Sequence, residues 1–467
     1  MLRMRILLSL FLSFFSLILV AQQDLTPYVI VDEIVIEGNN ITKPSIIYRE
    51  MTFAVGDTIS ENRFNEEIKI SKENLQNTTL FNFVDIETIY DGIEKVTIVV
   101  KVTERWYIWP YPYLVYSDRN LNSWYEADDF SRFSYGFDLE YKNFLGLKHS
   151  IKLTMIGGYN QNYGFTYDVP YLDKRQSLGL EFGAGYKRDK EVAYATEANK
   201  VQYFNVADEF AKQTIYVMLK PYYRFGYRNR LFLAMEYNDT KFSDSLPSLN
   251  DDFVNVFGET RFQYISLSLT FKNDFRDEQN YPLNGHYLEM MLHKNGIGVF
   301  ETAPDDFYGK MTFDWYQPIK GRWYWASNVT AKFSYGSDVA YFLNQGLGYK
   351  NDYVRTYDLY VIDAANFALM KNNLKFAILN PTTMYVPFIK NERFGKIHLA
   401  LYANIFFDCA YSWNMPGNPS SFLDNRFIYG TGVGIDFVTY YDKVIRFEYG
   451  INDMGETGLF IHLVAPI

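Results

Sequence analysis

The C-terminal three-quarters of this 467-residue chain consists of short segments in which apolar and polar residues alternate. Between residues 265 and 272 every odd position is Ile, Leu or Phe, and every even position is Ser, Thr or Lys. Neighbouring side chains of a strand point to opposite faces, so this period predicts a sheet with one apolar and one polar face. Sixteen antiparallel strands are predicted, at residues 106–116, 132–142, 149–157, 162–170, 177–188, 213–226, 229–240, 261–273, 285–295, 307–319, 322–335, 367–379, 396–410, 427–438, 443–451 and 458–466.

These segments fit a transmembrane β-barrel over residues 105–467. An even strand number is typical of bacterial outer-membrane barrels, and strands span lipid only as a closed barrel, because every backbone group must be paired there. Aromatic residues make up 19% of the chain, which suits lipid-facing strands and interfacial girdles. The alternative, a soluble β-sandwich, shows the same alternation. Residues 191–212 interrupt the pattern, so the strand that follows is the least well defined.

The N-terminus carries the features of an export signal. Arg3 and Arg5 precede an apolar run from Ile6 to Val20, and cleavage is plausible near Ala21. Residues 1–21 are therefore predicted to be a signal peptide. The alternative is an anchoring helix, for which the run is short. Export and a barrel together indicate the outer membrane of a Gram-negative bacterium.

Residues 28–104 are predicted to form one small α+β domain. Alternation predicts a first strand, Pro44 suits the first turn of a helix, and Ser60 suits the N-cap of a second helix. Two further strands flank Asp91-Gly92, a strong hairpin signal. The predicted order is β-α-α-β-β, with elements at residues 30–37, 44–51, 61–75, 83–89 and 96–102.

A long connection, residues 336–366, contains Val354-Arg355-Thr356-Tyr357, and Phe406-Phe407-Asp408 ends an alternating strand. The period of two places Asp408 on the face opposite the apolar one, where a carboxylate fits a lumen. We expect the connection to fold into the barrel and Arg355 to pair with Asp408. The alternative is two unrelated lumen charges. We call Val354, Arg355, Tyr357, Phe406 and Asp408 the loop–barrel lock.

Prolines mark the two ends of the predicted sheet. Pro110 and Pro112 lie in the first strand and Pro466 ends the last. Residues two apart direct their N–H groups to the same side, and proline has no N–H, so both missing donors of the first strand fall on one edge. We therefore predict that the first and last strands meet in a weak seam that opens sideways. The alternative is that the first strand starts after Pro112.

Several motifs resemble one known family. Ile34-Val35-Ile36-Glu37-Gly38-Asn39 and Leu80-Phe81-Asn82-Phe83-Val84 resemble a POTRA domain, a periplasmic module. Five blocks in order resemble the BamA/TamA superfamily of outer-membrane assembly and translocation proteins: Asn143-Phe144-Leu145-Gly146, Asn273-Asp274-Phe275-Arg276-Asp277 with Tyr281-Pro282-Leu283-Asn284-Gly285, Val354-Arg355-Thr356-Tyr357, Phe406-Phe407-Asp408, and Gly430 with Gly432 and Gly434. Thr356 replaces the glycine of the family signature, and one POTRA-like domain is present where fuller assembly factors carry several.

The resemblance implies a protein that receives unfolded client polypeptides at its POTRA-like domain and inserts or translocates them at the seam. Outer-membrane lipid and accessory assembly proteins are further expected partners. The alternatives are a two-partner secretion transporter for one dedicated client and a passive porin.

Other function classes are disfavoured. A formal charge of −10 argues against nucleic-acid binding. The chain has no hydrolase, metalloprotease or phosphate-loop motif, its five histidines are scattered, and Cys409 is its single cysteine. We expect no enzymatic activity, no cofactor and no metal.

Overall fold

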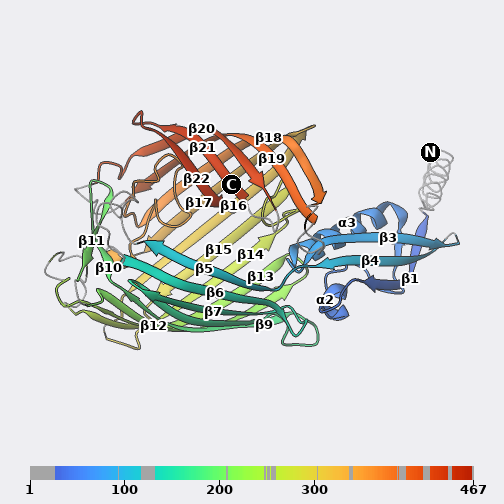
Figure 1. Cartoon of the computed structure of the whole chain (residues 1–467), viewed down its shortest axis with the longest axis horizontal. Helices are drawn as coiled ribbons and strands as arrows, with labels where there is room; N and C mark the ends of the chain where they lie inside the picture. The colour runs from blue at the N-terminus through green and yellow to red at the C-terminus, as the bar shows by residue number, and fades with distance from the viewer. Residues whose placement is uncertain are drawn as a thin grey trace, which may run out of the picture.

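The computed structural model describes residues 27–92, 94–116, 132–206, 209–246, 249, 253, 259–301, 303–335, 340–385, 388, 396–413, 421–439 and 444–464. An N-terminal domain is attached to one end of a large β-barrel (Figure 1). We call this the domain end of the barrel and the opposite one the far end. The predicted signal peptide, residues 1–21, and Pro466 lie outside the described residues.

The N-terminal domain packs two helices against a four-stranded sheet of order β2-β1-β4-β3. Strands β1 and β4 are parallel and lie side by side in the centre of the sheet. An apolar cluster forms the core and includes Val31, Ile47, Leu75, Val96 and Ile98, each 0% exposed. The elements are β1 (Tyr28–Glu37), α2 (Pro44–Tyr48), β2 (Thr58–Ser60), α3 (Glu61–Asn77), β3 (Phe81–Asp91) and β4 (Lys95–Glu104).

The predicted order of this domain agrees with the structure except in two details. The short strand β2, paired with β1, was not predicted, because three residues are too few to show a period. Helix α2 ends at Tyr48 instead of continuing to Met51. Ser60 is the N-cap of α3, although its side chain makes no capping hydrogen bond.

The barrel is one sixteen-stranded antiparallel sheet in which sequence neighbours pair. All sixteen predicted segments correspond to its strands. These are β5 (Ile108–Tyr116), β6 (Phe133–Phe144), β7 (His149–Gly158), β8 (Gln161–Val169), β9 (Leu178–Asp189), β12 (Lys212–Phe225), β13 (Asn229–Phe242), β14 (Arg261–Asp274), β15 (Gly285–Asn295), β16 (Asp306–Lys320), β17 (Trp323–Tyr335), β18 (Asn366–Tyr385), β19 (Lys396–Trp413), β20 (Phe427–Val438), β21 (Val444–Asn452) and β22 (Thr457–Val464).

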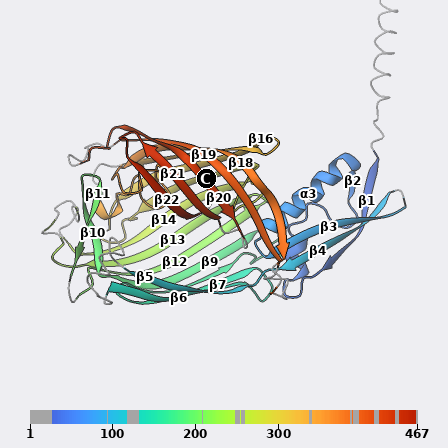
Figure 2. The same ribbon diagram turned by 45° about the horizontal axis from the view of Figure 1, so that its top comes forward.

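The interruption at residues 191–212 is a separate hairpin. Among the described residues, strands β10 (Glu191–Glu197) and β11 (Lys200–Asn205) pair with each other alone, and β9 pairs directly with β12. Figures 1 and 2 place this hairpin at the far end. It therefore covers an opening of the barrel and adds no strand to the wall.

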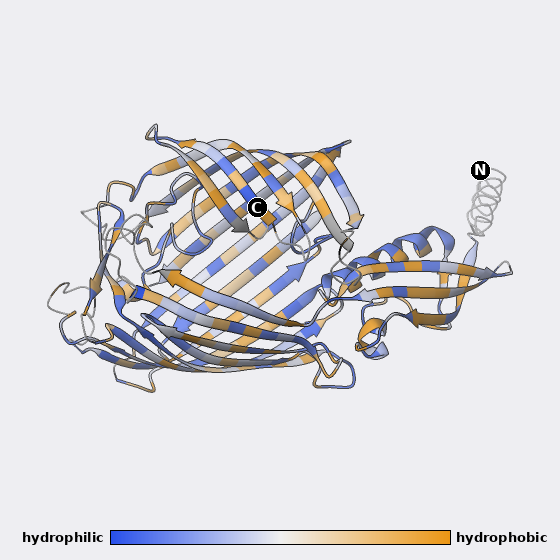
Figure 3. Ribbon diagram, viewed as in Figure 1, coloured by the Kyte–Doolittle hydropathy of each residue, from blue (hydrophilic) through white to orange (hydrophobic). Residues whose placement is uncertain are grey.

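Apolar side chains cover the outside of the barrel and polar ones fill the inside. In β19, Ile405 and Phe407 are 54% and 45% exposed, whereas Phe406 and Asp408 are buried. The same alternation runs along the strands in Figure 3. A sandwich would bury the apolar face, so the barrel prediction is confirmed. Within the described residues, no helix is both long enough and apolar enough to cross a membrane.

The sheet has two end strands, β5 and β22. Strand β5 pairs with β6, and β22 pairs with β21. No pairing joins β5 to β22 within the described residues. Each end strand therefore has one edge at which its backbone groups form no ladder with the other end strand among the described residues.

Candidate functional site

The long connection between β17 and β18 packs as a loop against the inner wall of the barrel. Val354 and Tyr357 are 1% and 3% exposed. They belong to an apolar cluster that also contains Phe367 and Leu369 of β18 and Ile428 of β20. The segment that carries the predicted lock is thus held by an apolar core of its own.

The structure brings Arg355 and Asp408 together. The Arg355 guanidinium forms a bidentate ion pair with the carboxylate: Nε donates to Oδ2 at 2.7 Å and Nη2 donates to Oδ1. The backbone N–H of Arg355 donates to Oδ2 at 3.2 Å. Arg355 is 2% exposed and Asp408 is 0% exposed. Two parallel charge-assisted bonds of this kind are the strongest form of an ion pair.

Three further groups surround the same guanidinium. Arg355 Nη1 donates to Asn373 Oδ1 at 2.8 Å and to Glu448 Oε1 at 3.0 Å. The guanidinium carbon lies 4.2 Å from the centre of the Phe406 ring, a cation–π distance. Asp408 and Phe406 belong to β19, Asn373 to β18 and Glu448 to β21, so one side chain connects the loop to three strands.

Glycines on the wall allow the loop tip to approach it. A Cβ built on Gly430 would lie 2.3 Å from the Arg355 carbonyl oxygen and 2.3 Å from Thr356 Oγ1. A Cβ on Gly450 would lie 2.6 Å from Thr356 Cγ2. Any other residue at these positions would push the tip away. Thr356 has a φ of 80°, so it adopts the left-handed backbone that glycine favours, although it replaces the glycine of the family signature.

A second buried charge cluster lies on the same wall and was not predicted. Arg446 of β21 donates to Asp436 of β20 through Nε at 2.8 Å and Nη2 at 3.0 Å. The Tyr281 hydroxyl donates to Asp436 Oδ2 at 2.7 Å, so the turn between β14 and β15 reaches into the lumen. Arg446 and Glu448 were visible only as polar positions of an alternating strand. Their partners follow from the register of neighbouring strands, which the sequence does not display.

The predicted seam prolines lie in β5, where Pro110 is opposite Leu139 and Pro112 is opposite Phe137. The backbone N–H of Lys142 donates to the Tyr107 carbonyl at 2.8 Å. Hydrogen-bonded positions alternate along an antiparallel pair, so the odd-numbered residues of β5 bond to β6 and the even-numbered ones point to the other edge. Both prolines therefore lack their donor at the edge of β5 that faces away from β6. The strand includes both prolines, which excludes a start after Pro112.

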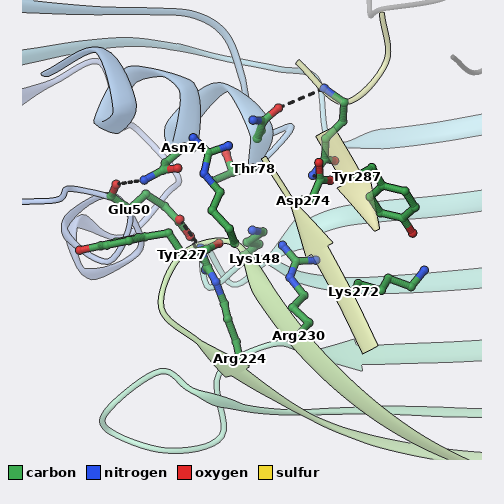
Figure 4. Close-up of a pocket in the computed structure, with 13 residues that line it drawn as sticks. Glu50, Asn74, Thr78, Lys148, Arg224, Tyr227, Arg230, Lys272, Asp274 and Tyr287 are labelled. Carbon is green, nitrogen blue, oxygen red and sulfur yellow. Dashed lines mark hydrogen bonds and ion pairs between the residues drawn. The ribbon is translucent and has the colours of Figure 1, made fainter. Parts of the chain in front are cut away.

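An ion pair also joins the N-terminal domain to the barrel (Figure 4). Arg224, at the domain end of β12, donates to Glu50 Oε1 at 2.6 Å and through Nη2 to Oε2. Glu50 follows helix α2, and the neighbouring Met51 carbonyl accepts the Tyr227 hydroxyl at 2.7 Å. Burial raises the pKa of the Glu50 carboxyl, but the charge and hydrogen bonds of Arg224 outweigh burial and lower it to about 2. Sequence reasoning missed this pair because it depends on how two domains meet.

Asn199 ties the loops of the far end together. It is fully buried, with a φ of 59° at the tip of the β10–β11 hairpin. Its side-chain amide donates to the Val361 carbonyl at 2.9 Å and to Ser421 Oγ at 2.8 Å. Its amide oxygen accepts the backbone N–H of Phe422 at 2.9 Å. One residue thus joins the hairpin, the long loop and the segment before β20.

No three His, Cys, Asp or Glu side chains of the described residues gather in a way that would hold a metal ion.

Known proteins resemble both parts of the chain. Residues 29–105 match the family model described as POTRA, surface antigen variable number repeat. No curated protein matches the chain. Among solved structures, CdiB from Escherichia coli is 13% identical with a TM-score of 0.54, over 93% of this chain and 75% of that one. This match shows a shared fold over nearly the whole length.

Two further solved structures are similar. BamA from Haemophilus ducreyi lacking POTRA domains 1–3 is 17% identical, with a TM-score of 0.49 over 93% of this chain and 83% of that one. CdiB from Acinetobacter baumannii is 14% identical, with a TM-score of 0.46 over 93% of this chain and 74% of that one.

Proposed function

We propose that this chain, which has the architecture of the BamA/TamA superfamily with one POTRA domain, inserts or translocates polypeptides at the outer membrane of a Gram-negative bacterium. In its finer form the proposal is an assembly factor for other outer-membrane proteins. The apolar outer surface of the barrel would contact lipid, and the POTRA domain would lie in the periplasm and receive unfolded clients.

The observation that carries the proposal is the pair of end strands, β5 and β22, that do not pair with each other in the described residues. An unpaired edge presents a row of backbone donors and acceptors, to which an incoming strand can bond. The prolines of β5 remove donors from that strand's edge, which leaves β22 as the better template. A porin has no use for such an edge or for a POTRA domain.

The loop–barrel lock gives this mechanism a rigid support. If the wall opens between β5 and β22, the neighbouring strands have to keep their arrangement. Arg355 joins the loop to β18, β19 and β21, so the C-terminal wall stays ordered while its last edge is free. No chemical step is required: the free energy of the client's own folding drives insertion, and we propose a non-enzymatic protein without cofactor or metal.

Crosslinking across the seam tests the proposal. Leu114 of β5 and Leu459 of β22 are 70% and 69% exposed on the outer face, so cysteines at both are accessible to a reducible dimaleimide crosslinker. The native Cys409 is first replaced by Ala. We expect the linked protein to fail to restore the outer-membrane proteome of a depleted strain, and reduction of the linker to restore it.

The matched control joins strands that are already paired. Leu233 of β13 and Leu269 of β14 are opposite each other and are 42% and 43% exposed, so linking cysteines there should leave the proteome unchanged. Full complementation by the Leu114–Leu459 crosslinked protein would overturn the proposal. Loss of a single exported protein would indicate a dedicated secretion transporter. Deletion of residues 28–104 with no effect on other barrels would indicate a porin.

A further inference from the structure

The junction between the POTRA domain and the barrel encloses a small cavity of about 60 Å³ (Figure 4). Residues of both parts line it, and its charged lining is mostly basic. The cations are Lys148, Arg224, Arg228, Arg230 and Lys272, and the carboxylates are Glu50 and Asp274.

Most of these charges are neutralised by neighbours. Arg224 is paired with Glu50. Outside the cavity lining, Glu73 accepts Arg228 at 3.2 Å and Glu289 lies 2.8 Å from Lys272 Nζ. The Asp274 carboxylate forms an ion pair with Arg276, whose Nη2 lies 2.8 Å from Oδ2. The carboxylates of the lining are therefore already engaged and cannot neutralise further cations.

Lys148 and Arg230 form no ion pair with any residue that the structure describes. Glu50 and Asp168 attract Lys148, whereas Arg224 and Arg230 repel it. Glu50 is occupied by Arg224, and Asp168 accepts the Tyr222 hydroxyl at 2.9 Å. The cavity thus holds a surplus of positive charge on two side chains.

We propose that this cavity binds an oxyanion, a phosphate or sulfate group, between Lys148 and Arg230. A water needs roughly 10–15 Å³ of such space, so the cavity has room for the oxygens of one tetrahedral anion. A dianion would match the two unpaired charges, and Arg forks and Lys ammonium groups are the usual phosphate ligands. A bound anion would also cancel the repulsion between Arg224, Arg230 and Lys148, and so stabilise the junction.

The titration of Lys148 gives the site a pH dependence. Burial lowers the pKa of Lys148 to about 7, with the Glu50 carboxylate opposing and Arg224 and Arg230 adding to the shift. Below this pH the ammonium is charged and attracts the anion. Above it the charge is lost, so affinity falls about tenfold per pH unit.

Calorimetric titration of the full chain in detergent with sulfate tests the site. Sulfate keeps its charge between pH 6 and pH 8, so any change in affinity comes from the protein. At constant ionic strength we expect one sulfate per chain and roughly tenfold weaker binding at pH 8 than at pH 6. Inorganic phosphate and glycerol phosphate, compared at pH 6, show whether the site takes a free ion or also a phosphate ester.

Variants separate the site from general charge effects. Lys148→Met and Arg230→Met should each abolish sulfate binding. Lys142 lies outside the cavity and pairs with Glu140, so Lys142→Met should leave sulfate binding unchanged. Lys148→Arg keeps its charge at every pH used and should bind sulfate equally at pH 6 and pH 8. Absence of stoichiometric sulfate binding at pH 6, or binding that survives both Met variants, would overturn the proposal. These readouts involve no client, so they are independent of the insertion function.

Discussion

At the scale of single residues, Arg355 makes contacts that no other side chain can reproduce. Its fork holds Asp408 with two nitrogens and reaches Asn373 and Glu448 with the third. Lysine has one nitrogen and no planar fork, so it cannot satisfy the same set. The pairing of Arg355 with Asp408 was predictable because each belongs to a recognisable local motif. Glu448 was not, since its place beside Arg355 depends on the register of β21.

Arg355→Ala should lower the free energy of unfolding by about 3–5 kcal/mol, because it leaves the buried Asp408 charge without a partner. Urea unfolding of the detergent-solubilised protein, followed by gel mobility, measures the change. Lys152→Ala is the control: its ammonium lies 3.6 Å from Asp138, the two side chains are 50% and 27% exposed, and the pair should contribute less than about 1 kcal/mol. Equal effects of the two variants would contradict the lock.

Gly430→Ala should displace the loop tip, since its Cβ would meet the Arg355 carbonyl and Thr356 Oγ1. Overpacking of this kind costs roughly 1–3 kcal/mol. Gly309→Ala is the control, because its Cβ would find its nearest neighbour at an ordinary 3.4 Å. Hydrogen exchange of residues 353–357 measures the displacement. Unchanged exchange in Gly430→Ala would show that the wall tolerates a side chain there.

At the scale of elements, the strands were predictable and their exceptions have physical reasons. A barrel strand faces lipid on one side and the polar lumen on the other, so its side chains alternate between apolar and polar. This alternation located all sixteen segments in the sequence. Strands β10 and β11 have no lipid-facing side, so their pattern does not follow that rule. Strand β18 extends to Tyr385, beyond its predicted end at 379, and its pairing with β19 is irregular after Ala377.

The contact between the turn after α2 and the end of β12 should weaken in acid. The Glu50 pKa falls from an ordinary 4.5 to about 2 in the docked protein. The carboxylate therefore stabilises docking fully above pH 4.5, and this contribution, on the order of 3 kcal/mol, is lost as the pH falls toward 2. Distances between spin labels in the POTRA domain and the barrel measure docking.

The control variants for docking are two glutamate substitutions. Glu50→Gln should already be loosened at pH 6 and should show no further change between pH 4.5 and pH 2.5. Glu87→Gln removes an exposed partner of Lys101 and should behave as the unaltered protein does. A docked Glu50→Gln protein would show that other contacts determine the domain position.

At the scale of the whole molecule, the two ends of the barrel differ. The domain end carries the POTRA domain and a basic cavity, and loops joined by Asn199 cover the far end (Figure 2). An assembly factor that works through its wall has no need to open the far end. A secretion transporter needs to open it.

Asn199→Gly should loosen the far end. Glycine keeps the left-handed backbone, so only the side-chain hydrogen bonds are lost, at about 1 kcal/mol each. Planar-bilayer recordings should show larger and more frequent conductance steps. Ala198→Gly, at a neighbouring left-handed position, is the control and should conduct as the unaltered protein does. Equal conductance of both variants would show that Asn199 does not hold the far end shut.

The interior position of Arg355 has a consequence for biogenesis. Its partners Asp408 and Glu448 lie 53 and 93 residues later in the chain. Contacts this distant in sequence form late and slowly. Because Asp408 belongs to β19 and Glu448 to β21, the pocket of the guanidinium is complete only when both strands have joined the wall. The arginine of the loop can therefore reach its final position only after most of the C-terminal wall has assembled.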